Sequence, residues 1–213
     1  MDETKVTTDG ASGLVYRFRP PVQSDGTAML LFHGLTGDED VMWVLETGLP
    51  VGGLIAAPRA PYAFEEGGYS WVPNPDDPAP EEYLESAKRI ETWIHTLTQQ
   101  HGLALSRTVF VGFSQGSALG FVTAGLPTVR PAALVALAAF LPQGNFSPLR
   151  GLPVFWGHGT QDDQIPISRA RKDVARLEEF GARVQLCEAD VGHKVGIECM
   201  RGLREWLARV IPT

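Results

Sequence analysis

Short apolar runs alternate along the chain with longer segments in which apolar residues recur every three or four positions. Short apolar runs are typical of buried strands, and the wider spacing is typical of helices that cover a sheet. The runs that predict strands are residues 13–19, 28–33, 54–58, 108–113, 132–140, 153–157 and 183–189. The pattern therefore predicts an α/β fold with a mostly parallel central sheet and helices on both faces.

Three long helices are predicted between or after these strands, at residues 81–100, 167–180 and about 196–210. The first places one apolar face at helical spacing, made of Leu84, Ala87, Ile90, Ile94 and Leu97. The second ends at Gly181, a residue typical of helix C-termini. The first strand alternates polar and apolar residues, so we expect it to form an edge hairpin with the strand at 28–33.

The irregular segment from Pro58 to Pro80 is rich in proline and contains two adjacent glycines. A loop of this length in a compact domain usually carries function or joins two domains. Because strands continue after it in the same rhythm, we expect a long surface loop on one domain spanning residues 1–213. Residues 1–12 are expected to be a flexible N-terminal segment, and a linker between two domains is the alternative for 58–80.

The charge balance is 25 acidic against 18 basic residues, a net charge of -7, which argues against nucleic acid or an anionic membrane as the main partner. Between Thr108 and Leu149 the only charge is Arg130, but glycines and prolines divide this stretch into pieces too short to span a bilayer. Stable membrane insertion is therefore not expected. These considerations leave a homodimer open.

The two cysteines, Cys187 and Cys199, are too few and too widely spaced for a C-x-x-C zinc site. One pair permits a disulfide without implying it, and we expect two buried or idle thiols in a reducing compartment. The N-terminus is polar and acidic, unlike a signal peptide, so the expected location is the cytoplasm.

The stretch "GFSQG", Gly112 to Gly116, matches G-x-S-x-G between a predicted strand and a helix rich in small residues. A sharp strand-to-helix turn exposes such a serine at the carboxyl edge of the sheet, at a helix N-terminus that favours negative charge. Side chains two positions before or after the serine would collide with the neighbouring turn. Ser114 is therefore the candidate nucleophile, with an ordinary polar turn as the alternative.

A serine needs a base to take its proton, and in this kind of fold the base follows it in the chain. His193 lies in the loop after the last predicted strand, whereas His158 lies at a strand exit and is expected to brace a loop. The base needs an orienting carboxylate, for which Asp162 and Asp163 are the candidates in "GHGTQDDQIP" and Asp190 is a third. Spacing alone leaves the choice between Asp162 and Asp163 open.

An oxyanion hole requires two backbone N–H groups aimed at the oxygen that becomes negative. The N–H of Gln115, directly after the serine, is one candidate. The other comes from the early loop "LLFHGLTGDE", where Leu35 follows the His33-Gly34 pair. His33 precedes the serine, the wrong order for a base in this fold, so we expect it to brace this loop.

With these residues in hand, the chain resembles the carboxylesterase and phospholipase family of α/β-hydrolases. The motifs that carry the resemblance run in the family's order from about residue 28 to 207: "LFHGLTGDE", "APRAPY" with "GGYSW", "VGFSQGSAL", "GHGTQDDQIP" and "GHKV". The resemblance implies a minimal α/β-hydrolase fold without a cap domain and places the catalytic acid on Asp162. It likewise implies Ser114 and His193 as the other triad members, Leu35 and Gln115 as oxyanion donors, and an acyl pocket near Trp71 and Tyr69.

The expected function is metal-independent and cofactor-free hydrolysis of short- to medium-chain carboxylic esters, with a small-molecule ester as the partner. The acyl pocket is expected to be formed partly by the loop 60–80. An acyl-thioesterase or a lysophospholipase of the same family is the nearest alternative. A non-catalytic binding protein with the same fold is the alternative from a different class, because fold alone does not fix function.

Overall fold

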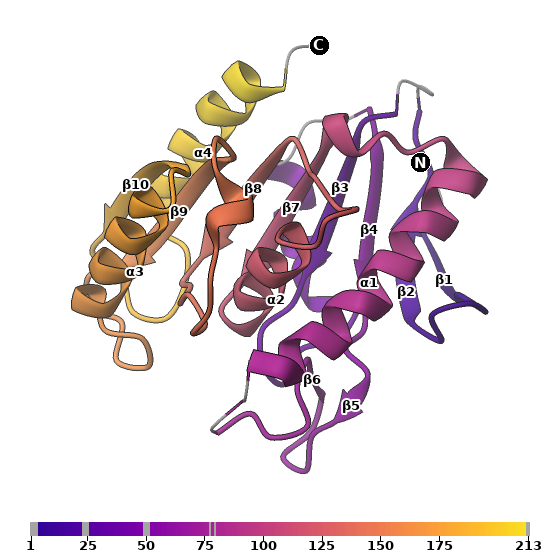
Figure 1. The fold of residues 1–213 in the computed structure, drawn as a ribbon, viewed down its shortest axis with the longest axis horizontal. Coiled ribbons are helices and arrows are strands. Elements are labelled where there is room, and N and C mark those ends of the chain that lie inside the picture. The colour runs from indigo at the N-terminus through magenta and orange to yellow at the C-terminus, as the bar shows by residue number, and fades with distance from the viewer. Residues whose placement is uncertain (1–3, 23–25, 49–51, 77, 79, 212–213) are drawn as a thin grey trace.

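The computed structural model describes residues 4–22, 26–48, 52–76, 78 and 80–211. Its centre is an eight-stranded sheet, which Figure 1 shows with helices around it. The strand order is β1-β2-β4-β3-β7-β8-β9-β10, parallel from β4 to β10 and antiparallel at β1 and β2. The strands are β1 (Lys5–Thr8), β2 (Val15–Arg19), β3 (Ala28–Phe32), β4 (Leu54–Pro58), β7 (Thr108–Phe113), β8 (Ala133–Leu137), β9 (Pro153–Gly159) and β10 (Arg183–Ala189). The predicted fold class is confirmed.

Helices cover both faces of the sheet (Figure 1). The long ones are α1 (Pro80–His101), α2 (Gln115–Ala124), α3 (Ile167–Glu179) and α4 (Ile197–Val210), and the 3-10 helices are η1 (Val41–Gly48), η2 (Leu105–Arg107) and η3 (Ser147–Leu149). Helices α1, α2 and α3 share one hydrophobic core, to which Ile90, Leu119 and Val174 belong. Helix α4 and η1 pack on the other core, with Trp43 and Leu203. Among the described residues, no helix is both long and apolar enough to cross a membrane.

The strand β2 does not form the hairpin with β3 that its alternating pattern predicts. It pairs antiparallel with β4 and with β1, because both edges of β3 are occupied by the parallel strands β4 and β7. Strand β1 lies in the segment that we expected to be flexible, so that expectation is wrong for residues 5–8. Residues 1–3 lie outside the described part of the chain.

The segment 58–80 is only partly the surface loop that its composition predicts. Strands β5 (Tyr62–Ala63) and β6 (Tyr69–Ser70) form a small antiparallel hairpin within it. Trp71 and Val72 directly follow this hairpin and are fully buried in the core shared by α1 and α2. The segment therefore enters the domain and packs beneath the site described below.

Cys187 and Cys199 form a disulfide bond, so the prediction of two separate thiols is wrong. Cys187 lies in β10 and Cys199 in the first turns of α4, and α4 packs back against β10. A sequence separation of 12 residues is bridged by a turn that brings their Cα atoms to 5.6 Å, a spacing that a disulfide spans. The argument for a reducing compartment loses its basis with this bond.

Candidate active site

Ser114 lies in a strained turn between β7 and α2. Its backbone has φ 49° and ψ -118°, a conformation that few residues other than glycine adopt. A Cβ on Gly112 would lie 2.5 Å from the backbone N of Ser117, and one on Gly116 would lie 2.2 Å from the carbonyl O of Phe32. The two flanking glycines are therefore required by close backbone approach, as their spacing in the sequence predicts.

The structure joins His193 to Asp162. His193 Nδ1 lies 2.8 Å from Asp162 Oδ2, and because a carboxylate only accepts, Nδ1 carries the proton and Nε2 is left as the basic nitrogen. Asp162 follows the end of β9 and His193 lies in the loop after β10. The parallel strands β7, β9 and β10 bring their carboxyl ends, and the loops that follow them, to one edge of the sheet.

Asp162 is buried and held by several hydrogen bonds. Its Oδ1 accepts from the backbone N–H groups of Gln164 at 3.0 Å and Ile165 at 2.8 Å. Burial by itself raises the pKa of this carboxyl, but the bonds from Ile165, His193 and Gln164 outweigh it and hold the pKa below its ordinary value. The side chain is thus kept ionised beside the imidazole.

The rival acidic residues lie elsewhere. Asp163 is exposed, and Asp190 accepts a hydrogen bond from the Thr160 hydroxyl at 3.4 Å. His158 is buried and its Nε2 donates to the carbonyl of Ile165 at 2.8 Å, so it braces the acid loop as predicted. Of the two residues between which spacing left the choice open, Asp162 is the one that is buried and hydrogen-bonded to His193.

His193 lies next to the turn that carries Ser114. Its ring meets that of Phe113, the residue before Ser114, edge to face with centroids 5.1 Å apart. A Cβ on Gly34 would lie 3.4 Å from the Cβ of Ser114, so the early loop also reaches this position. Three segments distant in sequence therefore meet at Ser114.

Two backbone N–H groups beside Ser114 are available to a ligand. Among the described residues, the N–H groups of Leu35 and Gln115 have no hydrogen-bond acceptor. Gln115 is the first residue of α2, where the helix dipole adds positive potential. The sequence predicts these same two N–H groups as the donors of an oxyanion hole.

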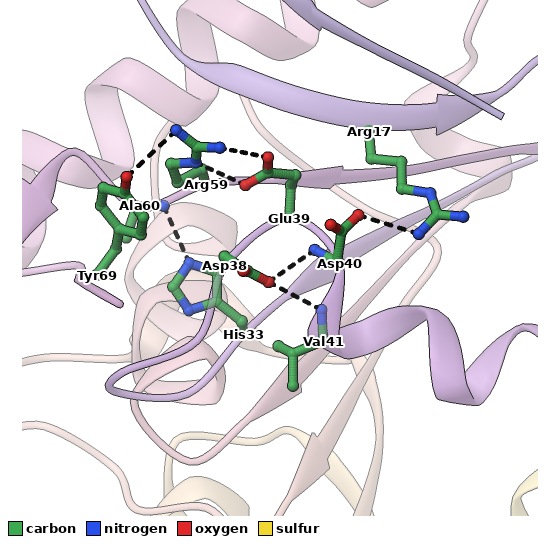
Figure 2. A network of polar contacts seen from close by, with 9 residues as sticks. All are labelled: Arg17, His33, Asp38, Glu39, Asp40, Val41, Arg59, Ala60 and Tyr69. Atoms are coloured by element: carbon green, nitrogen blue, oxygen red, sulfur yellow. Dashed lines mark hydrogen bonds and ion pairs between the residues drawn. The ribbon is translucent and has the colours of Figure 1, made fainter. Parts of the chain in front are cut away.

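The loop that carries Leu35 is braced by the segment that follows β4, where Arg59 and Ala60 lie (Figure 2). His33 Nε2 accepts from the backbone N–H of Ala60 at 3.0 Å, while its Nδ1–H lies 2.6 Å from the carbonyl of Gly34. Burial lowers the pKa of His33 to about 4, so the imidazole stays neutral. The predicted bracing role of His33 is thereby confirmed.

An ion pair braces the same loop, and sequence reasoning missed it. The guanidinium of Arg59 binds both carboxylate oxygens of the buried Glu39 and lies over the ring of Tyr69, with 4.8 Å to the ring centroid (Figure 2). The backbone N–H of Thr36 donates to the carbonyl of Tyr69 at 3.1 Å. Tyr69 therefore supports the loop through Arg59 and through its own backbone carbonyl. Glu39 stands in the motif "GDE" and Arg59 in "APRAPY", but the spacing of these motifs in the sequence does not indicate that the two side chains pair.

Trp71 joins the turn at Ser114 to the early loop. Its backbone N–H donates to Oε1 of Gln115 and its indole Nε1–H to the carbonyl of His33, both at 2.8 Å. The side chain is 0% exposed. The structure therefore places Trp71 in the core as a support, and not on the wall of an acyl pocket.

A cavity of about 860 Å³ lies next to the turn that carries Ser114, since Phe113, the residue before the serine, is part of its wall. Leu35, Met42 and Leu45 form one wall, with Phe113 and Met200 among the residues of the rest. Neither Tyr69 nor Trp71 lines it, and no described residue of the loop 60–80 is part of its wall. The cavity in the structure is therefore not the acyl pocket expected near Trp71 and Tyr69. No local pattern in the sequence predicts this cavity, because its walls come from positions more than 150 residues apart.

The chain offers no evident metal site within the described ranges, since no three His, Cys, Asp or Glu side chains gather to hold an ion. The parts assembled at Ser114 are instead a serine at a strand-to-helix turn, an acid-histidine pair and two free N–H groups. On a mostly parallel sheet, this arrangement defines the α/β-hydrolase class.

Within that class the chain belongs to the phospholipase/carboxylesterase family, whose model matches residues 19–211, and it is thus one of the serine hydrolases. It is 25% identical over 182 residues to acyl-protein thioesterase 1 of Cryptococcus neoformans, covering 72% of this chain and 74% of that protein. The family resemblance seen in the sequence is confirmed.

Solved structures share the fold. A carboxylesterase from Mesorhizobium loti superposes with a TM-score of 0.83 at 21% identity, over 96% of this chain and 98% of that one. A carboxylesterase from Bacillus cereus gives 0.81 at 16% identity, over 92% and 94%. At these identities the likeness concerns the fold, so the chemistry has to be argued from the residues of this chain.

Proposed function

We propose that the protein is a carboxylesterase that hydrolyses short- to medium-chain carboxylic esters through Ser114, His193 and Asp162. The observation that carries the proposal is the 2.8 Å hydrogen bond between Asp162 and His193 Nδ1. This bond leaves the basic nitrogen of His193 available beside the turn that holds Ser114.

In the first half of the reaction, Ser114 Oγ attacks the acyl carbon while His193 Nε2 takes the hydroxyl proton. The carbonyl oxygen becomes negative and accepts hydrogen bonds from the N–H groups of Leu35 and Gln115. The ionised Asp162 stabilises the imidazolium. When the tetrahedral intermediate collapses, the alcohol leaves with the proton from His193, and the acyl group stays on Ser114.

In the second half, His193 removes a proton from water, and the resulting attack on the acyl carbon releases the carboxylic acid and restores the serine. The same two N–H groups serve the second oxyanion. The strained backbone of Ser114 holds its hydroxyl out from the sheet edge without rearrangement between the steps.

The test is hydrolysis of p-nitrophenyl acetate and butyrate by the Ser114→Ala variant. We expect kcat to fall by at least about 10³-fold. Ser147→Ala is the matched control, because Ser147 is an exposed serine in the short helix η3 and its removal leaves the site intact. Labelling by a fluorophosphonate probe is expected for wild type and Ser147→Ala and absent in Ser114→Ala and His193→Ala. Wild-type hydrolysis by Ser114→Ala would overturn the scheme.

Thioester hydrolysis is the second candidate, favoured by the likeness to acyl-protein thioesterase 1. The same nucleophile and oxyanion donors serve either bond, since both reactions pass through an acyl-serine. The ratio of kcat/KM on a butyryl thioester and the matching oxygen ester distinguishes the two activities.

A further inference from the structure

The cavity has a mostly apolar wall and adjoins the candidate active site, because Phe113 directly precedes Ser114 and Lys194 directly follows His193. Leu35 of the oxyanion loop and Phe113 from the turn contribute to its wall. At its rim, Val44 of η1 and Ile197 of α4 are 79% and 76% exposed. Large apolar side chains so exposed on both sides of a cavity provide a surface for an apolar segment of a ligand.

The charge at this cavity is opposite to that of the whole chain. Every charged residue among the described ones that line it is basic: Lys194, Arg201 and Arg204. Lys194 directly follows His193 and Arg201 lies in α4, and neither forms an ion pair with a described residue. On a chain of net charge -7, Lys194 and Arg201 are therefore open to an external anion.

The nearest carboxylate along α4 does not cancel this charge. Glu198 is not among the residues that line the cavity. Its carboxylate lies instead near Gly196 and the end of β10 at Ala189, because its Oε2 would be 3.3 Å from a Cβ placed on Gly196. Lys194 and Arg201 thus line the cavity, and no acidic residue is among the described residues of its wall.

We propose that the preferred substrates are esters that carry an anionic group, a carboxylate or a phosphate. An apolar segment between that group and the scissile ester fills the cavity. The anion is held at the rim by Lys194 and Arg201, and a cluster of like charges in a concave site raises the local concentration of such substrates. This inference rests on the proposed function, because it concerns the substrate of the same serine.

The test uses substrates that differ only in charge. On the acyl side, the 4-nitrophenyl monoester of glutaric acid is compared with its neutral methyl ester. On the alcohol side, 4-butyryloxybenzoate is compared with its neutral methyl ester. We expect the anionic member of at least one pair to be preferred about tenfold in kcat/KM, mainly through KM, at low ionic strength. The pair that shows the preference tells which side of the ester bears the anion.

Salt and substitution then identify the origin of the preference. It is expected to fall severalfold between about 0.05 and 0.5 M NaCl, because salt screens charges at the surface. The double variant Lys194→Gln/Arg201→Gln is expected to bring the ratio to about one. Lys88→Gln/Lys172→Gln removes the same charge from exposed positions of α1 and α3, on the opposite face of the sheet, and is expected to keep the ratio.

Two failures are distinguishable. If neutral and anionic members are hydrolysed equally by the wild type, or the preference survives in Lys194→Gln/Arg201→Gln, the substrate class is wrong while the esterase proposal stands. If neither member of any pair is hydrolysed, or Ser114→Ala hydrolyses them like the wild type, the proposed function itself fails.

Discussion

Removal of the disulfide between Cys187 and Cys199 is expected to reduce both stability and activity. The bond closes a loop with a sequence separation of 12 residues, and His193 lies inside that loop. For a loop of this length the lost chain-entropy restraint amounts to about 3 kcal/mol. In a domain of 213 residues this corresponds to a Tm lower by about 7 °C. Because the freed loop carries the base, we expect kcat on p-nitrophenyl butyrate to fall more than KM changes.

The assay compares the double variant Cys187→Ala/Cys199→Ala with the wild type, each with and without dithiothreitol. The wild type is expected to lose stability on reduction, while the variant, which has no disulfide, is expected to be insensitive to the reagent. Mass spectrometry after alkylation in denaturant without reductant counts the thiols directly. Two alkylated cysteines in the native oxidised sample, or equal Tm values with and without reductant, would refute the reasoning. The prediction of a cytoplasmic location is tested by the same count, since such bonds are rare in reducing compartments.

Three further predictions concern the site. Gly116→Ala is expected to abolish fluorophosphonate labelling or folding, because its Cβ would lie 2.2 Å from the Phe32 carbonyl; Gly120→Ala, with 3.5 Å to the nearest side chain, is its tolerated control in the same helix. Glu39→Gln breaks the ion pair that braces the oxyanion loop, and we expect kcat to fall about tenfold with little change in KM, measured on p-nitrophenyl butyrate. The pKa of Asp162 is lowered on folding, so its contribution to stability is fully present above the unfolded pKa near 4 and is lost as pH falls through the lower folded pKa; urea unfolding from pH 7 to pH 3 measures this loss.

Each of these has a result that contradicts it. Equal labelling of Gly116→Ala and Gly120→Ala would mean that the turn tolerates a side chain. A kcat of Glu39→Gln within twofold of the wild type would show that the loop holds its shape without the ion pair. For the acid, Asp162→Asn should show a weaker decline in stability below pH 4 than the wild type, and an identical decline would assign the effect to other groups.

Local pattern in the sequence was sufficient for most of the sheet. The apolar runs at 28–33, 54–58 and 108–113 are strands close to the predicted bounds, because a buried strand needs a continuous apolar stretch wherever it pairs. Pairing itself is not local. Strand β2 looks like a hairpin partner for β3, and only the arrival of β4 and β7 on both sides of β3 sends it to β4.

In the candidate site, too, some features follow from local sequence and others depend on contacts between distant segments. The glycines around Ser114 and the order of serine, acid and histidine can be read from the chain, since close backbone approach and chain order leave marks in the sequence. Burial leaves no such mark in the sequence. A tryptophan in a proline-rich loop, such as Trp71, has the same sequence context whether it lines a pocket or packs in the core. The disulfide likewise depends on how α4 docks on β10, which no spacing of two cysteines specifies.

The proposed nucleophile and base belong to parts of the sheet with unequal support. Ser114 follows β7, which has parallel partners on both sides, whereas His193 follows β10, an edge strand paired only with β9. Edge elements open at lower free energy than central ones. On warming, we therefore expect the loop that carries His193 to open while the turn that carries Ser114 is still folded. Heat inactivation would then occur at a lower temperature than global unfolding. The inactivation temperature would therefore measure the local stability of the edge strand β10 and not that of the whole domain.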